Sequence, residues 1–302
     1  MNAGTVIGGG FRLMRERPLA VAVWFVLYLA ATVAINLATL PWLRSTQAEF
    51  AATNSGAMSP AAFMGAMLGR AVLFGLIFII LYVVLIAASQ RAVLRPGPDR
   101  FFYLRLGMDE LRLLALAIIL AILFYFGAIV ASMIAAAIVG IVIVASGSGA
   151  MAPAIFLPIL AIVLLSIWFE VRFALAFPLT LMRRKIIIGE AWVVTRGRFW
   201  TLFGAFLAIM LLLIALTMVV ALVTNAAELG AMLHSGSDPL AAQQAAQAQM
   251  AAQLGGISGR MVLQWVLGAI VGTFGIVLFG GAIATAAKEL TVNLEDIAET
   301  FA

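Results

Sequence analysis

The chain has 302 residues, of which 65% are apolar and only 10% are charged. A soluble domain carries roughly 45–50% apolar and about 25% charged residues, so this composition excludes a water-soluble protein and predicts an all-α integral membrane protein. The absence of cysteine excludes disulfides, thiolate nucleophiles and cysteine-ligated metals, and the single His234 excludes a multi-histidine site. The net charge of +5 does not predict nucleic-acid binding, because the basic residues flank apolar segments instead of gathering on a soluble domain.

Apolar runs recur along the chain at about 20 residues, the length of a helix that crosses a bilayer core of roughly 30 Å. The run 113–145 is longer: it would extend about 50 Å at roughly 1.5 Å per residue, so this helix must tilt, break or project beyond the lipid, and its continuity stays open. The first run exceeds the usual 7–15 residues of a signal-peptide core, so we treat it as an uncleaved span. We predict one transmembrane domain over residues 1–302, with spans at 19–40, 71–89, 113–145, 154–182, 202–223 and 261–287.

The basic residues predict the orientation of the six spans. With the N-terminus placed inside, 15 of the 18 Lys and Arg residues fall on inside segments, and only Arg44, Arg70 and Arg260 fall outside. Cytoplasmic segments of membrane proteins carry this excess of positive charge. We therefore expect both termini in the cytoplasm, and a multi-pass protein of the bacterial inner membrane.

Three basic amphipathic segments lead into the first, third and fifth spans, at 11–24, 104–117 and 194–207. Helices of this composition lie in the membrane interface, so we predict an interfacial elbow helix before each of these spans. The spacing suggests three helix-pair repeats of about 80–110 residues, since internal repeats are common in membrane transporters. Convergence of interfacial sequences is the alternative explanation.

Charged residues near membrane depth are confined to Glu170 and Arg172 in the fourth span. Residues two apart on a helix do not face each other, so we expect Glu170 to pair with a cation of another helix and Arg172 to reach the headgroups. Structural anchoring is favoured over a site role. The middles of the other spans carry no ionisable group, which argues against a proton or sodium relay. The sequence therefore predicts no catalytic residue, metal site or cofactor, and a protein that is not an enzyme.

Small residues recur at helical spacing in the last span, where Gly268-xxx-Gly272 is followed by Gly275. Such residues let membrane helices approach closely. Packing within the bundle is the favoured interpretation. A seam between copies of the chain, and a groove for an acyl chain, are the alternatives.

The stretch Arg172–Leu207 reads RFALAFPLTLMRRKIIIGEAWVVTRGRFWTLFGAFL. It contains a helix end with Arg, then Pro, a basic run, an acidic-Ala pair and Thr-Arg-Gly-Arg-Phe-Trp before another span. This resembles a poorly characterised bacterial six-span family that includes the membrane domain of glycerophosphoryl diester phosphodiesterases. The catalytic barrel of the fused members has no counterpart here. The resemblance therefore implies membrane placement and a link to lipid or envelope physiology, and it supplies no catalytic residue.

Two functions fit these features. The first is a non-enzymatic protein that binds or moves lipids or another apolar ligand, with anionic lipids as partners of basic interfacial segments. The second is a scaffold or assembly factor that contacts itself or another membrane protein through its helices. For the first, the expected headgroup contacts are six cations: Arg172, Arg183, Arg184, Lys185, Arg196 and Arg198.

Overall fold

The computed structural model describes residues 2–54, 56, 58–97, 101–105, 107–146, 151–235 and 257–300. Within these ranges the chain is helical and forms no strand. The helices are α1 (Ala3–Glu16), α2 (Pro18–Asn54), α3 (Pro60–Leu94), α4 (Met108–Ser146), α5 (Met151–Phe173), α6 (Ala176–Arg183), α7 (Gly189–Val194), α8 (Phe199–Ser235) and α10 (Gly259–Thr300).

Six segments of the described chain are helical, long and apolar enough to cross a membrane, which confirms the predicted number of spans. Their physical basis is the same throughout: a helix satisfies its own backbone hydrogen bonds, which a lipid environment cannot do. The third span, whose continuity the sequence left open, is one unbroken helix, α4. The six segments are Pro18–Trp42, Ala61–Leu94, Met108–Ile141, Ile159–Arg183, Phe199–Ala226 and Gly259–Thr291.

The fourth span is made of two helical pieces. Helix α5 ends at Phe173, and α6 begins at Ala176 after a two-residue turn. The cause is Pro178, which has no amide hydrogen to donate to the carbonyl of Ala174 four residues earlier. The predicted single span at 154–182 therefore changes direction near its end.

The three predicted elbows adopt three different structures. Before α2, α1 is a separate helix whose buried face includes Val6 and Leu13. Before α4 there is no helix among the described residues of 101–107; the positive φ angles of Phe102 (53°) and Tyr103 (64°) form a turn, and α4 starts directly at Met108. Before α8, the six-residue α7 lies upstream of the expected segment.

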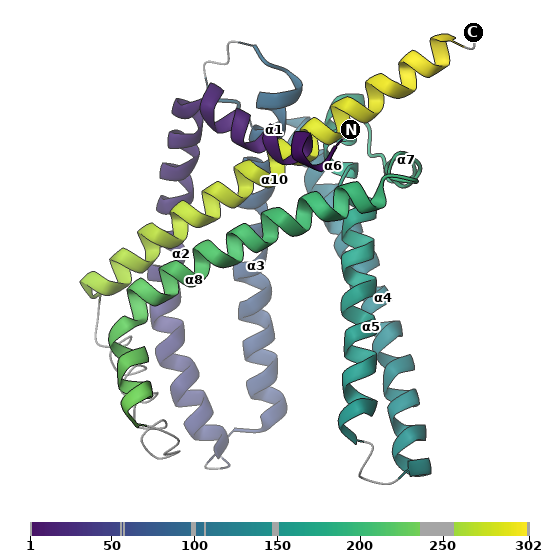
Figure 1. Cartoon of the computed structure of the whole chain (residues 1–302). Helices are drawn as coiled ribbons and strands as arrows, with labels where there is room; N and C mark the ends of the chain where they lie inside the picture. Colours follow the sequence, from purple (N-terminus) through teal and green to yellow (C-terminus); the bar gives the residue numbers. More distant parts are fainter. Residues whose placement is uncertain are drawn as a thin grey trace. The chain divides into compact units, whose positions relative to one another are not determined.

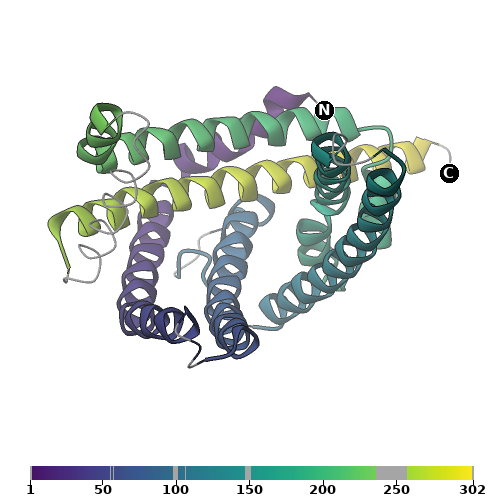
Figure 2. The same cartoon turned by 90° about the horizontal axis from the view of Figure 1, so that it is seen from below.

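The chain folds as two compact units. Unit 1 contains Met1–Leu13, Ile86–Leu207 and Phe279–Ala302, and unit 2 contains Met14–Leu85 and Ala208–Leu278. Helices α3, α8 and α10 each contribute residues to both units, and Figure 2 shows α10 as one unbroken helix. The prediction of a single transmembrane domain over residues 1–302 stays a prediction.

Unit 2 holds α2 and α3 side by side (Figure 1). The guanidinium of Arg70 donates to both carboxylate oxygens of Glu49, at 2.9 and 2.5 Å. The ring of Trp42 stacks on that of Phe74 with centroids 5.7 Å apart. The α2–α3 pair is thus held by a bidentate ion pair and by aromatic packing.

Unit 1 contains the helices that form the candidate sites. Helices α4 and α5 lie side by side in both views (Figures 1 and 2), and α6 and α7 pack against them and each other. The buried interior of unit 1 includes Leu116, Leu175, Leu179 and Leu202, whose side chains are fully buried. This packing fixes the ends of α4 and α5 where the polar residues lie.

Candidate functional site

An apolar groove of about 310 Å³ runs between α4, α5 and α7 in unit 1. The hydroxyl of Ser166 in this groove donates to the carbonyl of Ile162 at 2.8 Å, so its hydrogen is already used within α5. Gly127 contributes only backbone, and no atom lies within 4 Å of the position that a Cβ would take there. The lining residues of this apolar groove are Leu123, Phe124, Gly127, Ala128, Ala131, Ile162, Leu165, Ser166, Trp168, Phe169, Phe173 and Trp192.

Arg172 lies beside one end of the apolar groove, among aromatic rings. Its guanidinium carbon is 5.8 Å from the ring centroid of Trp168 and 5.2 Å from that of Trp192, both of which line the groove, and 5.8 Å from that of Phe199. Cations are attracted to aromatic faces at such distances. The Nε and Nη1 atoms are buried and have no hydrogen-bond partner within the described structure. The aromatic rings thus position the Arg172 guanidinium, and its Nε and Nη1 donors make no hydrogen bond among the described residues.

The other five predicted headgroup residues do not join Arg172 in one cluster. Arg183 pairs with Glu190 at 3.3 Å, with both side chains substantially exposed. Arg184 lines a different cavity, described below. Lys185, Arg196 and Arg198 are exposed. Of the six, Arg172 is the residue whose aromatic neighbours, Trp168 and Trp192, also line the apolar groove in the described part of the chain.

Glu170 is exposed on α5 and forms no ion pair within the part of the chain that the structure describes. The cation of another helix that we expected beside it is absent there. Its neighbour Arg172 points among aromatic rings instead. The two charges on this helix thus have separate environments.

The three glycines of the last span have three environments on α10. A Cβ at Gly272 would lie 2.6 Å from the Tyr28 hydroxyl of α2, and one at Gly275 would lie 3.2 Å from Leu213 of α8. Gly268 is exposed, with no atom within 4 Å of that position. Gly272 and Gly275 are therefore contact positions inside unit 2, and Gly268 faces open space.

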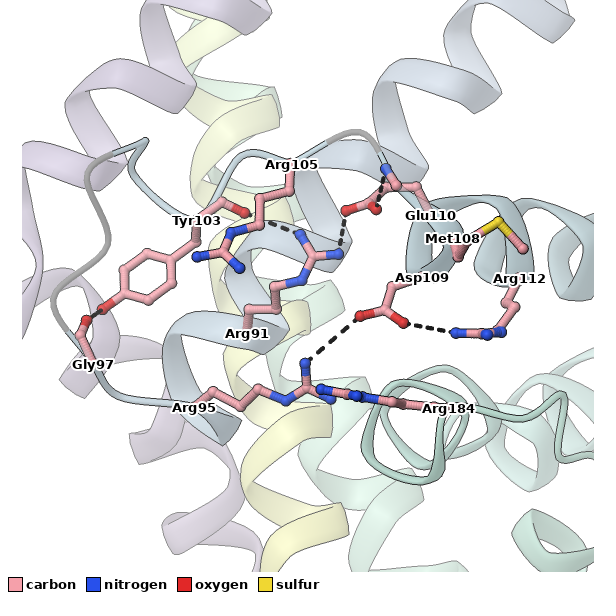
Figure 3. Close-up of a pocket in the computed structure, with 11 residues that line it drawn as sticks. Arg91, Arg95, Gly97, Tyr103, Arg105, Met108, Asp109, Glu110, Arg112 and Arg184 are labelled. Atoms are coloured by element: carbon pink, nitrogen blue, oxygen red, sulfur yellow. Dashed lines mark hydrogen bonds and ion pairs between the residues drawn. The ribbon is translucent and has the colours of Figure 1, made fainter.

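A second cavity in unit 1, of about 460 Å³, is lined mostly by charged residues and lies at the start of α4 (Figure 3). We call it the arginine pocket. It brings together five arginines and two carboxylates, a formal excess of three positive charges. Its lining residues are Arg91, Arg95, Gly97, Tyr103, Arg105, Gly107, Met108, Asp109, Glu110, Arg112 and Arg184.

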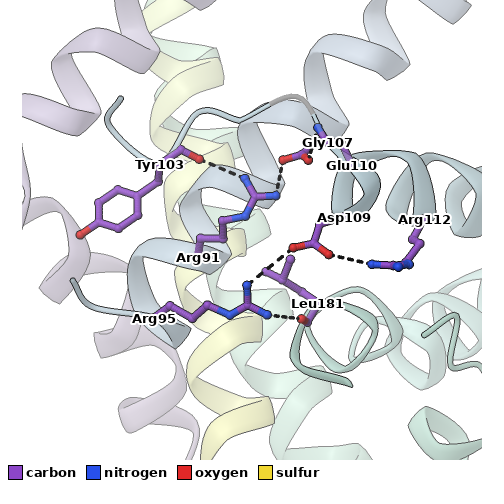
Figure 4. A network of polar contacts seen from close by, with 8 residues as sticks. All are labelled: Arg91, Arg95, Tyr103, Gly107, Asp109, Glu110, Arg112 and Leu181. Carbon is purple, nitrogen blue, oxygen red and sulfur yellow. Dashed lines mark hydrogen bonds and ion pairs between the residues drawn. The ribbon is translucent and has the colours of Figure 1, made fainter. Parts of the chain in front are cut away.

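The carboxylates of the arginine pocket are engaged in ion pairs (Figure 4). Arg91 pairs with Glu110 and donates to the Tyr103 carbonyl at 3.1 Å. Asp109 lies between two arginines, 3.0 Å from Arg112 and 3.6 Å from Arg95. Both carboxylates belong to the first turn of α4, where negative charge also stabilises the positive end of the helix dipole.

Sequence reasoning missed the arginine pocket because the positive-inside rule already accounted for its basic residues. A signal was present in the segment 91–112, which contains five arginines and three acidic residues, Asp99, Asp109 and Glu110. Arg184, however, comes from the end of α6, far away in sequence. No local pattern brings it to the start of α4.

Among the described residues, no group of three His, Cys, Asp or Glu side chains could hold a metal ion. Comparison of the chain with models of protein families, with curated proteins and with solved structures found no match. The resemblance to the six-span family thus stays a prediction that rests on residues 172–207.

Proposed function

We propose that the chain is a non-enzymatic membrane protein that binds a lipid, with an acyl chain in the apolar groove and an anionic headgroup at Arg172. The observation that carries this proposal is the position of Arg172. Its buried donors lack a partner, and two of the rings around it, Trp168 and Trp192, also line the groove. An apolar cavity next to a held cation matches the two ends of an anionic lipid.

The energetics favour such a ligand at both ends. A methylene group removed from water stabilises a complex by about 0.8 kcal/mol, but lipid tails are apolar already, so the groove selects by shape more than by burial. The headgroup end supplies a stronger term, because a buried donor without a partner costs about 1–3 kcal/mol and an anionic oxygen would satisfy it. We therefore place the specificity at Arg172.

The proposal includes the membrane orientation of the six spans and the repeated helix pairs. With both termini in the cytoplasm of a bacterium and the protein in its inner membrane, Arg172 falls at the cytoplasmic leaflet, whose anionic lipids attract basic residues. Trp168 and Trp192 fall at the depth where tryptophan is enriched. The short helices α1 and α7, each ahead of a long helix, are compatible with a repeated helix-pair unit.

The first test fills the groove. Gly127→Leu places a side chain in the apolar groove, and Gly140→Leu places the same side chain on an open, exposed face of the same helix α4. We expect native mass spectrometry of gently extracted protein to detect less retained lipid for Gly127→Leu and unchanged lipid for Gly140→Leu. Equal lipid content in both variants and the wild type would contradict the proposal.

The second test removes the cation. Arg172→Gln eliminates one charge-assisted contact, for which we expect about a tenfold lower affinity for an anionic lipid and little change for a zwitterionic one. Titration of phosphatidylglycerol and of phosphatidylcholine into the purified protein measures the difference. Lys185→Gln is the matched control, since Lys185 is exposed and does not line the groove. A loss of equal size for both lipids would contradict a headgroup role.

A scaffold or assembly factor is the second candidate. Gly268 on α10 favours it, because an exposed small residue on a long apolar helix leaves space for another membrane helix or a second copy of the chain. Native mass spectrometry separates the two functions. A stable oligomer or complex without enriched lipid would favour the scaffold.

A further inference from the structure

The arginine pocket has a formal surplus of positive charge over its two carboxylates, and Arg184 contributes to that surplus. Glu110 is committed to Arg91, and both side chains are buried, at 8% and 6% exposure. Asp109 is shared by Arg95 and Arg112. Arg184 has no ion pair or hydrogen bond to any residue that the structure describes. An additional anion would therefore find guanidinium donors already assembled.

Arg184 has an unusual backbone conformation and lies close to another arginine. Arg184 caps the end of α6 in the left-handed conformation, with φ 54° and ψ 30°. Residues with a Cβ disfavour this conformation, and glycine is the usual residue there. The Arg184 side chain lines the pocket and points toward the guanidinium of Arg95 (Figure 3). Two like charges that converge repel each other, and an anion between them removes the repulsion.

The chemistry of the lining selects the class of anion. Guanidinium groups bind phosphate oxygens through paired N–H donors, and several together match a group that carries about −1.5 to −2 charges. The volume of about 460 Å³ lies within the range of roughly 300–1,000 Å³ for small-molecule sites, so the pocket has room for more than a single small ion. A phosphate ester meets both conditions.

We propose that the arginine pocket is a binding site for a phosphate-bearing anion, held by Arg184 and Arg95. This site is separate from the apolar groove, and none of its lining residues lines that groove. The phosphate comes from a soluble phosphate compound or from the headgroup of an anionic lipid. Both sources present the same oxygens to the arginines.

The test uses the full chain in neutral detergent, titrated calorimetrically with inorganic phosphate at low salt. The variant Arg184→Gln breaks no hydrogen bond or ion pair among the described residues, and we expect it to bind phosphate about 10-fold to 100-fold more weakly than the wild type. Arg198→Gln is the matched control, because Arg198 is also exposed and does not line the pocket. Its affinity should equal that of the wild type.

A variant with the opposite effect sharpens the test. Asp109→Asn removes the carboxylate that Arg95 and Arg112 share, so phosphate should bind several-fold more tightly. A purely structural role of this network predicts no such gain. Unchanged or weaker binding, in an Asp109→Asn protein as thermally stable as the wild type, overturns the proposal.

Nanodiscs distinguish the two sources. The protein is reconstituted in phosphatidylcholine with or without phosphatidic acid, and phosphatidic acid that co-purifies through Arg184 supports a lipid headgroup. Saturable binding of inorganic phosphate through Arg184 supports a soluble ligand. Binding of neither, or equal binding by Arg184→Gln and the wild type, overturns the site. Arg172→Gln should leave phosphate binding intact, so this proposal and the lipid groove fail separately.

Discussion

Arg91 and Glu110 illustrate how a charged residue is tolerated in the interior of unit 1. Their side chains are only 6% and 8% exposed, and each has a second partner: the Tyr103 carbonyl for Arg91, and the backbone amide of Gly107, 3.0 Å away, for Glu110. A buried ion pair offsets the cost of desolvation only when such extra hydrogen bonds are present. The pair therefore fixes the turn 101–107 against the start of α4.

Removal of one partner should be costly. Glu110→Gln leaves the Arg91 charge buried without a counter-ion, and we expect the free energy of unfolding to fall by about 3–5 kcal/mol. Glu190→Gln is the control, since the Arg183–Glu190 pair is exposed and such pairs contribute at most about 1 kcal/mol. Thermal and denaturant unfolding in the same detergent compares the two. Similar destabilisation of both variants would show that burial does not govern these pairs.

Glycines allow α1 and α10 to approach each other within unit 1. A Cβ at Gly281 would lie 2.7 Å from the Cα of Gly10, and a Cβ at Gly9 would overlap the side chain of Thr285. At Gly281 the neighbouring atoms belong to the backbone of α1, so no side chain can move aside there. Gly9 and Gly10 are thus part of a helix contact, and the run Gly8-Gly9-Gly10 lacks the residues that would make it a phosphate loop.

The α1–α10 contact gives a prediction about alanine substitutions on one helix. Gly281→Ala should destabilise the protein by about 1–3 kcal/mol, because the added methyl group overpacks the contact with α1. Gly268→Ala should be neutral or stabilise it by up to about 1 kcal/mol, because its surroundings are open and alanine favours a helix. Thermal unfolding of both variants measures the difference. A more stable Gly281→Ala protein would mean that the two helices do not touch there.

The sequence predicted the long helices well and their connections poorly, for a physical reason. The length of a span depends on a continuous run of apolar residues, and such a run is visible in the sequence alone. The break after Phe173 depends on Pro178, which removes a hydrogen bond to the carbonyl four residues earlier, so the sequence does carry a signal for this break. The turn at Phe102 and Tyr103 has no glycine or proline at its positive-φ residues, so no local signal marked it.

The candidate sites were less predictable because they depend on contacts between distant residues. The sequence singled out Arg172 by its depth in a span, but the rings of Trp192 and Phe199 reach it only through the fold. For Arg184 the sequence predicted a headgroup contact from its charge alone, whereas the structure brings that side chain to the start of α4. Side-chain surroundings follow from packing, which composition does not encode.

The proposed orientation of all six spans can be tested with one reagent, because the chain contains no cysteine. Lys185→Cys and Ile257→Cys each introduce a single exposed thiol. In right-side-out membrane vesicles, we expect a membrane-impermeant maleimide to label Ile257→Cys and not Lys185→Cys. Permeabilised vesicles, in which both should react, are the control. The reverse pattern would place both termini outside.

Arg95 has a consequence for how the chain is synthesised. One end of its guanidinium approaches Asp109, and the other donates to the carbonyl of Leu181 at 2.9 Å, across 86 positions of sequence. The Leu181 contact cannot form until α4, α5 and α6 have all left the ribosome, and closing so long a loop carries an entropic cost. The ion pair between Arg91 and Glu110, in contrast, joins residues only 19 positions apart. The side of the arginine pocket that carries Arg184 therefore cannot be in place before α6 has been synthesised.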